Sequence, residues 1–427
     1  MVSIEYLKNK NILVFGMGNT GLATVRKLKK KIQNISAWDD NANSRNYAKK
    51  KFDIFFNKNF YKNSYDFIIM SPGINIYQHP HSSFFKNNFN KIITDIDIFI
   101  SSIDLNKNKI IAITGTNGKS TFCKLLHHVM NSKKKAYLLG NYGKPVLSHN
   151  QHLENNFYIL ELSSYQIEYS KFLKTHACAI LNITPDHLDR HKTLSNYINI
   201  KLKIFNSLLP KSCGFLNKNF QYLNRIKKNR NIIKVSLVKN LFIKNKFLNK
   251  DGYFPSISII YNILRFFKFS KKIIITKFNS FKPLPHRQEF VRKINNITFI
   301  NDSKATNFES AKFSLKLFDN IYWIAGGILK KNDSINFNDE LKKKIFKTYI
   351  IGKNTSLFQS IIKNKIKYLV CKTIGKAVLQ AYKDAQHSKS KNNVILLSPA
   401  AASFDQFKNF EHRGNLFKSI IKNIKNV

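Results

Sequence analysis

Residues 111–121 join an apolar run to a glycine-punctuated loop that ends in a lysine and two hydroxyl side chains. In such a loop the backbone N–H groups turn toward an anion, the lysine supplies a point charge and the hydroxyls reach Mg²⁺. The Walker pattern requires a glycine at position 113, where this chain has Ile113, so the loop is a shorter variant. The sequence therefore predicts a nucleotide-phosphate site at Gly115, Thr116, Asn117, Gly118, Lys119, Ser120 and Thr121.

Two further polar groups follow apolar runs in the same part of the chain. Glu161 closes the run Tyr158-Ile-Leu, and His187 lies in Thr184-Pro-Asp-His-Leu-Asp-Arg after a second run. A carboxylate and an imidazole aimed at the phosphate loop suit a Mg²⁺–triphosphate site, because Mg²⁺ takes one or two protein ligands plus phosphate oxygens. A purely structural histidine is the alternative for His187.

A second glycine turn lies near the N-terminus. The apolar run from Ile12 to Phe15 precedes Gly16, Gly18 and Gly21, which form G-x-G-x-x-G, and Asp39-Asp40 follow about 20 residues later. This pattern fits a dinucleotide site, and it fits equally a Rossmann-like half that binds another nucleotide. Another apolar run, 67–70, leads into Ser71-Pro72-Gly73.

These loops need parallel strands to bring them to one sheet edge, and the alternation of strand-like and helix-like segments predicts a doubly wound α/β fold. We predict three domains: a Rossmann-like domain at 1–107, a central P-loop-type ATPase domain with a mostly parallel sheet at 108–281, and a Rossmann-like α/β domain at 282–427. The two prolines of segment 281–287 indicate the second linker. Residues 211–255, rich in Lys and Asn, are interpreted as surface connections.

The composition narrows the function classes. The formal charge is +48 over 427 residues, but lysine is spread along the whole chain and arginine is scarce, which favours compositional drift over specific nucleic-acid binding. No apolar stretch is long enough to span a membrane, and the start of the chain lacks the layout of a signal peptide. We expect a cytoplasmic monomer without membrane insertion, with reduced thiols at Cys123, Cys178, Cys213 and Cys371.

Taken together, the polar segments resemble those of the Mur ligase family, in order and over nearly the whole chain. Segments 302–307 and 402–410 resemble the branch of that family that adds D-glutamate. The matching segments are 16–21, 71–74, 114–121, 161–166, 182–190, 285–287, 301–307 and 398–407.

The resemblance implies an ATP-dependent amide-bond-forming ligase of peptidoglycan precursor synthesis. ATP would phosphorylate the carboxylate of UDP-N-acetylmuramoyl-L-alanine, and the amine of D-glutamate would displace phosphate from the acyl phosphate. It implies catalytic roles for Lys119, Glu161, His187 and Lys201. It also implies two Mg²⁺ ions held by Ser120, Glu161, His187 and Lys201, with Lys201 carrying a CO₂-derived carbamate.

The resemblance assigns the remaining site residues to three ligands. His286, Arg287 and Asp302 would lie near ATP, together with the phosphate loop. D-Glutamate would be bound by Lys304, Thr306, Lys330, Ser403 and Phe410. The UDP substrate would be bound by Gly16, Gly18, Asn19, Thr20, Asp39, Asp40, Ser71, Gly73, Asn141 and His187.

Two segments depart from the family pattern. An acidic residue is replaced by Ile328, and a His-Asn pair is replaced by Ser258-Ile259, which bears on the adenine contact. The alternatives are another Mur-type or folylpolyglutamate-type amide ligase, a basic nucleic-acid-dependent NTPase, and a Rossmann oxidoreductase. The last leaves the second glycine loop unexplained.

Overall fold

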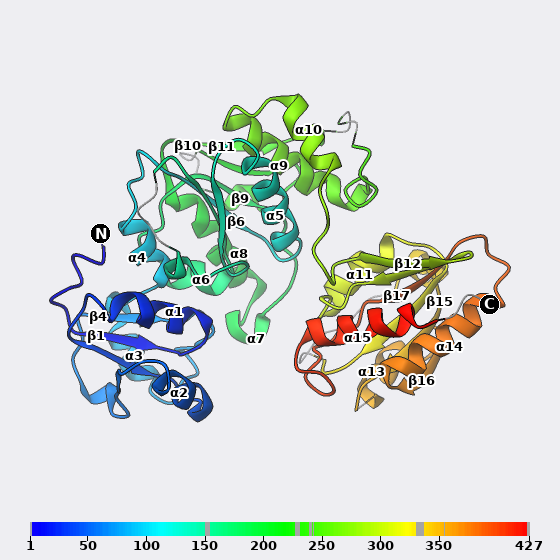
Figure 1. The fold of residues 1–427 in the computed structure, drawn as a ribbon, viewed down its shortest axis with the longest axis horizontal. Helices are drawn as coiled ribbons and strands as arrows, with labels where there is room; N and C mark the ends of the chain where they lie inside the picture. The colour runs from blue at the N-terminus through cyan, green and yellow to red at the C-terminus, as the bar shows by residue number, and fades with distance from the viewer. Residues whose placement is uncertain are drawn as a thin grey trace. The chain divides into compact units, whose positions relative to one another are not determined.

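The fold is taken from a computed structural model that describes residues 2–149, 154–226, 231–238, 241, 243–329, 337–353 and 355–424 (Figure 1). The chain divides into two compact units. The first unit comprises residues 1–249 and 253–281, and the second comprises residues 250–252 and 282–427. The prediction of an α/β fold with mostly parallel sheets is confirmed. The three domain boundaries stay a prediction.

The first sheet of the first unit is parallel throughout and has the strand order β3-β2-β1-β4-β5. Its central strand β1 is fully buried, as a strand covered on both faces must be. The strands are β1 (Ile12–Phe15), β2 (Ile35–Trp38), β3 (Phe55–Phe56), β4 (Phe67–Met70) and β5 (Ile92–Ile93). The helices are α1 (Asn19–Leu28), α2 (Ala42–Lys49), α3 (Ser82–Asn87) and α4 (Asp95–Ser101), with a 3₁₀ turn η1 (Phe60–Lys62).

The second sheet of this unit is also parallel and has the order β11-β10-β9-β6-β8-β7. Its strands are β6 (Lys109–Thr114), β7 (Ala136–Gly140), β8 (Phe157–Glu161), β9 (Thr175–Ile180), β10 (Leu208–Asn217) and β11 (Ile232–Val235). Its helices are α5 (Lys119–Met130), α6 (Ser164–Tyr169), α7 (Leu188–His191), α8 (Leu194–Leu202), α9 (Phe254–Phe266) and α10 (Lys271–Asn279).

The interpretation of residues 211–255 as surface connections is wrong for two stretches. Most of β10 falls in this segment, and β11 pairs with it at the edge of the sheet. Edge strands such as β11 tolerate lysine on their exposed side, which hides the apolar alternation in the sequence.

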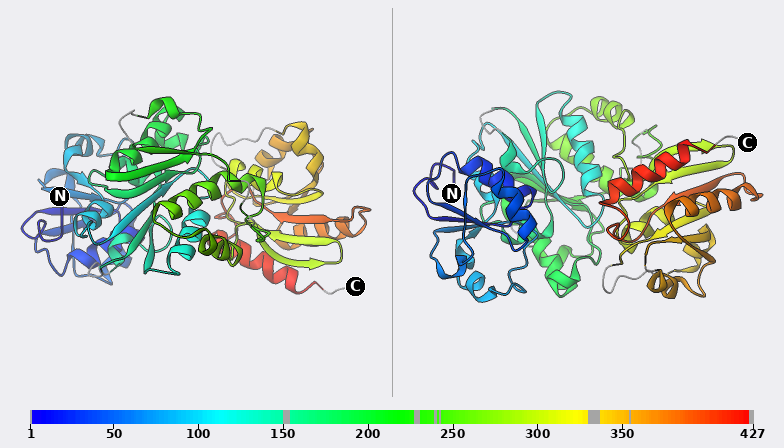
Figure 2. Two further views of the ribbon diagram at one scale, coloured as in Figure 1. Left: turned by 90° about the horizontal axis from the view of Figure 1, so that it is seen from above. Right: turned by 60° about the horizontal axis from the view of Figure 1, so that its bottom comes forward.

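The second unit holds one six-stranded sheet of order β12-β13-β17-β14-β15-β16, in which only the β12–β13 pair is antiparallel. Helices α14 and α15 lie side by side and pack on one face, whereas α11, α12 and α13 pack on the other (Figures 1 and 2). The strands are β12 (Glu289–Ile294), β13 (Ile297–Asn301), β14 (Ile321–Gly326), β15 (Ile345–Ile351), β16 (Tyr368–Lys372) and β17 (Asn393–Leu397). The helices are α11 (Phe308–Lys316), α12 (Asp339–Lys344), α13 (Ser356–Ile362), α14 (Ile374–Gln386) and α15 (Phe410–Lys422).

Helix α4 connects the two sheets of the first unit. Thr94 and Asp97 form a capping box at its start, which satisfies backbone N–H groups of the first turn. The other carboxylate oxygen of Asp97 accepts hydrogen bonds from Ser170 Oγ and from the backbone N–H groups of Lys171 and Phe172, at 2.6, 2.9 and 2.7 Å. Asp95 lies in the same turn, and within the described part of the chain its buried Oδ1 has no hydrogen-bond partner.

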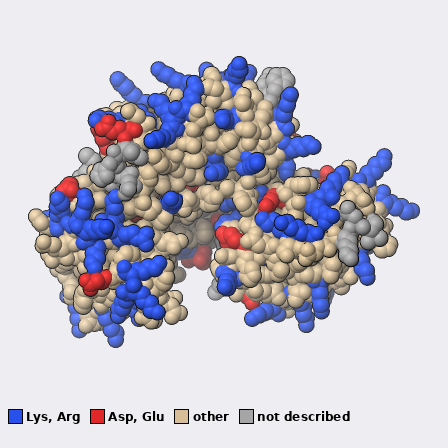
Figure 3. Space-filling view, viewed as in Figure 1, with Lys and Arg blue, Asp and Glu red and all other residues tan. Residues whose placement is uncertain are grey.

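Many charged side chains lie on the surface, whereas the thiols are buried. Lys and Arg side chains are scattered over the visible surface of both units, with few acidic groups among them (Figure 3). All four cysteines carry free thiols and are buried. In the described part of the chain, no helix is long and apolar enough to cross a membrane.

Candidate active site

The predicted phosphate loop joins the end of β6 to the start of α5, where a helix N-terminus favours an anion. Gly118 has φ +80°, in the left-handed region that glycine adopts without strain. The Nζ of Lys119 donates to the carbonyl oxygens of Gly115 and Thr116, both at 2.8 Å, so the ammonium lies over the loop. Ser120 and Thr121 lie in the first turn of α5 and are buried.

Asn182, just beyond β9, holds this loop in shape. Its Oδ1 accepts from the backbone N–H groups of Thr116 and Asn117 at 3.1 and 2.9 Å, and its Nδ2 donates to the carbonyl of Asn117. The Oγ1 of Thr116 also lies 3.1 Å from the hydroxyl of Tyr197. The sequence placed Asn182 in a polar cluster but gave no reason to pair it with a loop 65 residues away.

Glu161 lies at the end of β8, next to β6, and its side chain is buried. Its Oε1 accepts from Asn141 Nδ2 at 2.8 Å, whereas its Oε2 is buried and has no hydrogen-bond partner among the described residues. An orphaned carboxylate oxygen beside a phosphate loop is the donor that a hard cation needs. No group of three or more His, Cys, Asp or Glu side chains gathers as a metal cage in the described residues. The site therefore fits Mg²⁺ that is bound largely by phosphate oxygens and water.

Lys201 on α8 is fully buried beside the same loop. Its Nζ donates to the carbonyl of Gly115 at 2.8 Å and to Oγ1 of Thr114 at 3.2 Å. Burial, with a further contribution from the charge of Lys119, holds the pKa of Lys201 well below its usual range. The amine is therefore neutral far more often than a surface lysine, and a neutral amine is the form that reacts with CO₂.

His187 immediately precedes α7 and has φ +54°, an uncommon backbone conformation for a residue with a side chain. Its Nε2 lies 3.3 Å from Oδ2 of Asp186, and its ring lies 5.1 Å from that of Tyr165. The neighbouring His191 is buried against Ser164 Oγ at 2.9 Å, and burial lowers its pKa to about 4. Of the two histidines, the predicted one is the more exposed.

The glycine turn of the first sheet lies between β1 and α1. A Cβ atom at Gly21 would lie 1.8 Å from the carbonyl oxygen of Gly16, so helix and strand approach too closely for any side chain there. Ser71 Oγ donates to that same carbonyl at 2.8 Å. Gly16, Ser71 and the loop of Gly73 therefore lie at one end of the sheet, beside Asn19 and Thr20 at the start of α1.

The two acidic residues predicted to bind the UDP substrate are both engaged within the protein. Asp39 accepts from the backbone N–H of Met17 at 2.5 Å, which ties β2 to the glycine turn. Asp40 accepts from the indole N–H of Trp38 at 3.1 Å and lies 2.9 Å from Nε2 of His79. His79 and Arg45 were not predicted. The guanidinium of Arg45 lies 4.4 Å from the centre of the Trp38 ring. His79 contacts Asp40 but lies 39 residues further along the chain, in the loop before α3.

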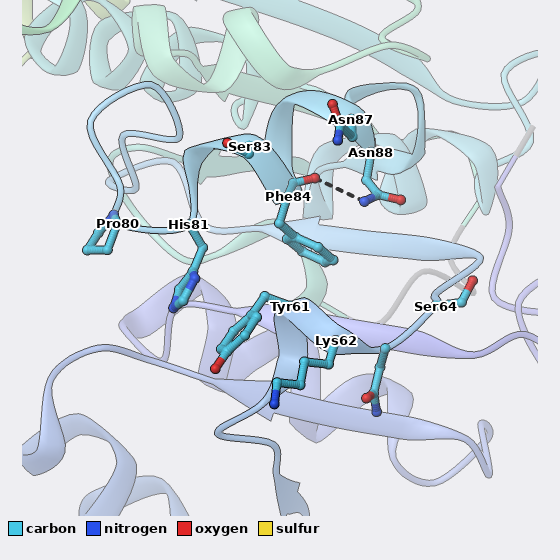
Figure 4. Close-up of a pocket in the computed structure, with 10 residues that line it drawn as sticks. Tyr61, Lys62, Ser64, Pro80, His81, Ser83, Phe84, Asn87 and Asn88 are labelled. Atoms are coloured by element: carbon cyan, nitrogen blue, oxygen red, sulfur yellow. Dashed lines mark hydrogen bonds between the residues drawn. The ribbon is translucent and has the colours of Figure 1, made fainter.

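A cavity of about 660 Å³ lies between η1 and α3 in the same sheet domain (Figure 4). The rings of Tyr61 and His81 stack at 4.0 Å along it, and Asn88 donates to the carbonyl of Phe84. None of the residues predicted to bind the UDP substrate lines this cavity.

In the second unit, Lys304 and Phe410 lie together. The ammonium of Lys304 lies 3.7 Å from the centre of the Phe410 ring, and its backbone N–H donates to the carbonyl of His286 at 3.1 Å. Thr306 follows Lys304 in the same loop, and Ser403 is buried in the loop after β17. Lys330 lies outside the described residues.

Asp302 is fully buried and accepts from Ser314 Oγ at 2.6 Å and from Ser398 Oγ at 3.0 Å. Burial raises the pKa of Asp302 to about 6. Arg413 of α15, also buried, donates to the carbonyls of Ser303 and Ala401, and so joins the loops after β13 and β17. Buried hydrogen bonds thus hold in place the loops that carry Lys304 and Ser403.

The two departures from the family pattern occupy different environments. Ile328 is 48% exposed and forms a backbone bridge with Ala402. Ser258 lies inside α9 with its Oγ accepting from the backbone N–H of Val238 at 3.0 Å. The hydroxyl of Ser258 is therefore committed within the protein.

Comparison with known proteins gives matches over the full length of the chain. The Mur ligase middle domain matches residues 113–253. UDP-N-acetylmuramoylalanine--D-glutamate ligase of Rickettsia bellii is 36% identical, over 96% of this chain and 97% of that protein. The proteins of the same name from Rickettsia prowazekii and Wolbachia pipientis wMel are 36% and 31% identical, over 97% and 99% of this chain and 98% of each protein.

Solved structures share the fold at lower identity. The MurF ligase of Thermotoga maritima, solved in complex with ADP, aligns with a TM-score of 0.59 at 13% identity, over 99% of this chain and 98% of that one. The UDP-N-acetylmuramate-alanine ligase MurC of Thermotoga maritima aligns with a TM-score of 0.58 at 14% identity, over 98% of this chain and all of that one.

Proposed function

Because the chain belongs to the Mur ligase family, we propose that it joins D-glutamate to UDP-N-acetylmuramoyl-L-alanine and converts ATP to ADP and phosphate. It is an ATP-dependent amide-bond-forming ligase of peptidoglycan precursor synthesis. One observation supports this choice of reacting site: two buried groups lie beside the phosphate loop. They are Oε2 of Glu161, which has no hydrogen-bond partner among the described residues, and the amine of Lys201.

In the proposed reaction, the phosphate loop and Lys119 hold the β- and γ-phosphates of ATP while a substrate carboxylate attacks the γ-phosphorus. The acyl phosphate so formed is attacked by the amine of D-glutamate, and phosphate leaves from a tetrahedral intermediate. Such a reaction needs positioning and charge neutralisation more than covalent help from the protein. Bound Mg²⁺, held by Glu161, Ser120 and His187 together with phosphate oxygens, would neutralise the developing charge.

Lys201 is proposed to carry a carbamate. Its neutral amine adds to CO₂, a proton is released, and an anion replaces a neutral amine beside the loop. The carbonyl of Gly115 and the hydroxyl of Thr114 now contact the amine. The burial of the amine and its lowered pKa support the proposal. The carbamate would supply Mg²⁺ with an anionic oxygen donor in addition to that of Glu161.

We propose that the remaining substrates occupy the other two sheets. The glycine turn, with Asp39, Asp40, Ser71 and Asn141, would bind the UDP substrate. Lys304, Thr306, Lys330, Ser403 and Phe410 would bind D-glutamate, whose two carboxylates need cations and hydroxyls in place of water. His286, Arg287 and Asp302 would lie near ATP. ATP and a UDP-sugar are intracellular metabolites, so we propose a cytoplasmic location. We also propose that the protein acts as a monomer.

The test is phosphate release with each substrate omitted in turn. We expect release only when ATP, Mg²⁺, UDP-N-acetylmuramoyl-L-alanine and D-glutamate are all present. Release that does not require D-glutamate would contradict the proposal. A panel of other amino acids and of glutamyl folates distinguishes a related amide ligase, and stimulation by DNA or RNA would indicate a nucleic-acid-dependent NTPase.

Lys119→Ala and Lys201→Ala should each abolish phosphate release, and bicarbonate should not restore the second variant. Lys203→Ala is the matched control, because Lys203 lies two residues after Lys201 and its side chain is exposed. With ¹³C-bicarbonate, a carbamate carbon signal should appear in the wild type and in Lys203→Ala but not in Lys201→Ala. A signal that survives in Lys201→Ala would refute the assignment.

A further inference from the structure

The side chain of Arg190 on α7 joins three separate segments of the first unit. Its guanidinium donates to Oδ1 of Asn75, to the hydroxyl of Tyr169 and to Oε2 of Glu168, the last at 2.9 Å. The side chains of Arg190 and Glu168 are only 6% and 9% exposed, so the ion pair is largely shielded from water. Shielded, hydrogen-bonded charge pairs hold their geometry far better than surface pairs do.

Three tyrosine rings surround the same guanidinium. The ring centres of Tyr77, Tyr165 and Tyr169 lie 5.8, 5.5 and 5.4 Å from the central carbon of Arg190. Tyr77 and Asn75 come from the first sheet domain, whereas the other two rings come from α6. A planar guanidinium donates in several fixed directions and contacts ring faces at once, which an ammonium does not do.

Each of the three joined segments leads directly from a residue of the proposed site. Asn75 lies two residues after Gly73, in the loop that begins at Ser71. Helix α6 begins three residues after Glu161, and Arg190 itself lies three residues after His187. The backbone N–H of Arg190 donates to the carbonyl of His187 at 3.1 Å, so the two residues share one turn.

A second contact reinforces the connection. The hydroxyl of Tyr169, which accepts from Arg190, also donates to the carbonyl of Ile74 at 3.0 Å. The loop after Gly73 is therefore bound to α6 and α7 through adjoining side chains. Movement of this loop relative to His187 would break the contact of Arg190 with Asn75 and the hydrogen bond of Tyr169 with Ile74 together.

From these contacts we propose that Arg190 is a positioning residue that fixes the loop Ser71–Asn75 against His187, so that the UDP substrate bound by the first sheet presents its carboxylate to the phosphate loop. The inference rests on the proposed function. Arg190 acts through Asn75 and through the turn of His187, and its own charge is already satisfied by Glu168.

The test uses the full-length protein and isothermal titration calorimetry with UDP-N-acetylmuramoyl-L-alanine. Arg190→Lys keeps the charge but loses the fork, and we expect its Kd and KM for this substrate to rise at least tenfold. The Kd for a non-hydrolysable ATP analogue should stay within twofold of wild type. Asn75→Ala should have a similar effect, and the double variant should be no weaker than the worse single variant, because both remove the same connection.

Lys171→Met is the matched control. Lys171 also bridges the two sheet domains, since its Nζ donates to the carbonyls of Phe89 and Asn90 at 2.6 and 2.8 Å, but it does so away from the site loops. We expect its Kd for the UDP substrate to match wild type. Equal weakening in Lys171→Met and Arg190→Lys would overturn the proposal, because Arg190 would then be one of several general docking contacts.

The outcomes separate this inference from the proposed function. If the wild type binds the UDP substrate and Arg190→Lys binds it within twofold, the inference is wrong while the proposed function stands. If the wild type does not bind the UDP substrate, the proposed function is wrong and the inference falls with it. Should Arg190→Lys not fold by circular dichroism, Tyr169→Phe removes one acceptor of the guanidinium and should raise the Kd at least threefold, and an unchanged Kd would refute the inference.

Discussion

Replacing Asp95 by asparagine should stabilise the first unit at neutral pH and have little effect under acidic conditions. Asp95 is 2% exposed, and burial together with the nearby charge of Asp97 raises its pKa to about 7. The pKa of an aspartate in an unfolded chain is about 3.9. The difference corresponds to about 4 kcal/mol, because each tenfold change in a protonation equilibrium is worth about 1.4 kcal/mol.

The direction follows from proton linkage. Between about pH 4 and pH 7 the folded state keeps the Asp95 proton that the unfolded state has lost, so the stability that this group contributes falls as pH rises. Above pH 7 the folded protein holds a buried carboxylate with an unpaired oxygen. Asp95→Asn removes this dependence. Its advantage over wild type should therefore grow by up to about 4 kcal/mol between pH 4 and pH 8.

Hydrogen–deuterium exchange of peptides covering α4 measures this change. Variant and wild type are compared at the same pH, so that intrinsic exchange rates cancel and the ratio reports the free energy of opening. Asp53→Asn is the control, because that side chain is exposed and lies outside α4. A difference between Asp95→Asn and wild type that does not change with pH would refute the reasoning, as would a more stable wild type at pH 8.

Three further changes test the proposed site. Gly21→Ala places a Cβ atom 1.8 Å from the carbonyl oxygen of Gly16, so calorimetry should show at least a tenfold loss of UDP-substrate affinity; unchanged affinity would place that substrate elsewhere. Glu161→Gln should raise the Mg²⁺ concentration for half-maximal phosphate release at least tenfold, and an unaltered Mg²⁺ titration, after chelator treatment, would argue against Glu161 as a ligand. Phe410→Ala should raise the KM for D-glutamate about tenfold, or about 1.4 kcal/mol, through loss of the ring under Lys304, with the KM for ATP unchanged. An increase in the KM for ATP alone would reverse that assignment.

Much of the fold follows from local sequence. The runs at 12–15 and 67–70 coincide with β1 and β4, because short apolar runs bounded by glycine or proline are typical of strands buried on both faces. The phosphate loop could also be predicted from the sequence, because its functional residues are consecutive. Strands β10 and β11 were missed because lysine and asparagine on exposed positions hide the period of two.

The contacts that hold the site together could not be read from the sequence. Asn75 and Arg190 are 115 residues apart, and nothing in either segment signals the other. Asp39 illustrates a related limit. Asp39 was identified by its spacing from the glycine turn, but its hydrogen bond with the backbone N–H of Met17 depends on the register between two strands. Contacts between residues that are distant in the sequence therefore determine which polar side chains hydrogen-bond within the fold.

The four buried thiols make the protein its own reporter of unfolding. Burial raises the pKa of each thiol, so none presents an appreciable thiolate to an alkylating reagent while its surroundings stay closed. Cys123, Cys178 and Cys213 belong to the first unit and Cys371 to the second. Alkylation at neutral pH, followed by peptide mass analysis, would therefore time the opening of each unit separately, without an introduced label. Substrates that tighten one unit would slow the labelling of its cysteines and leave the others unchanged.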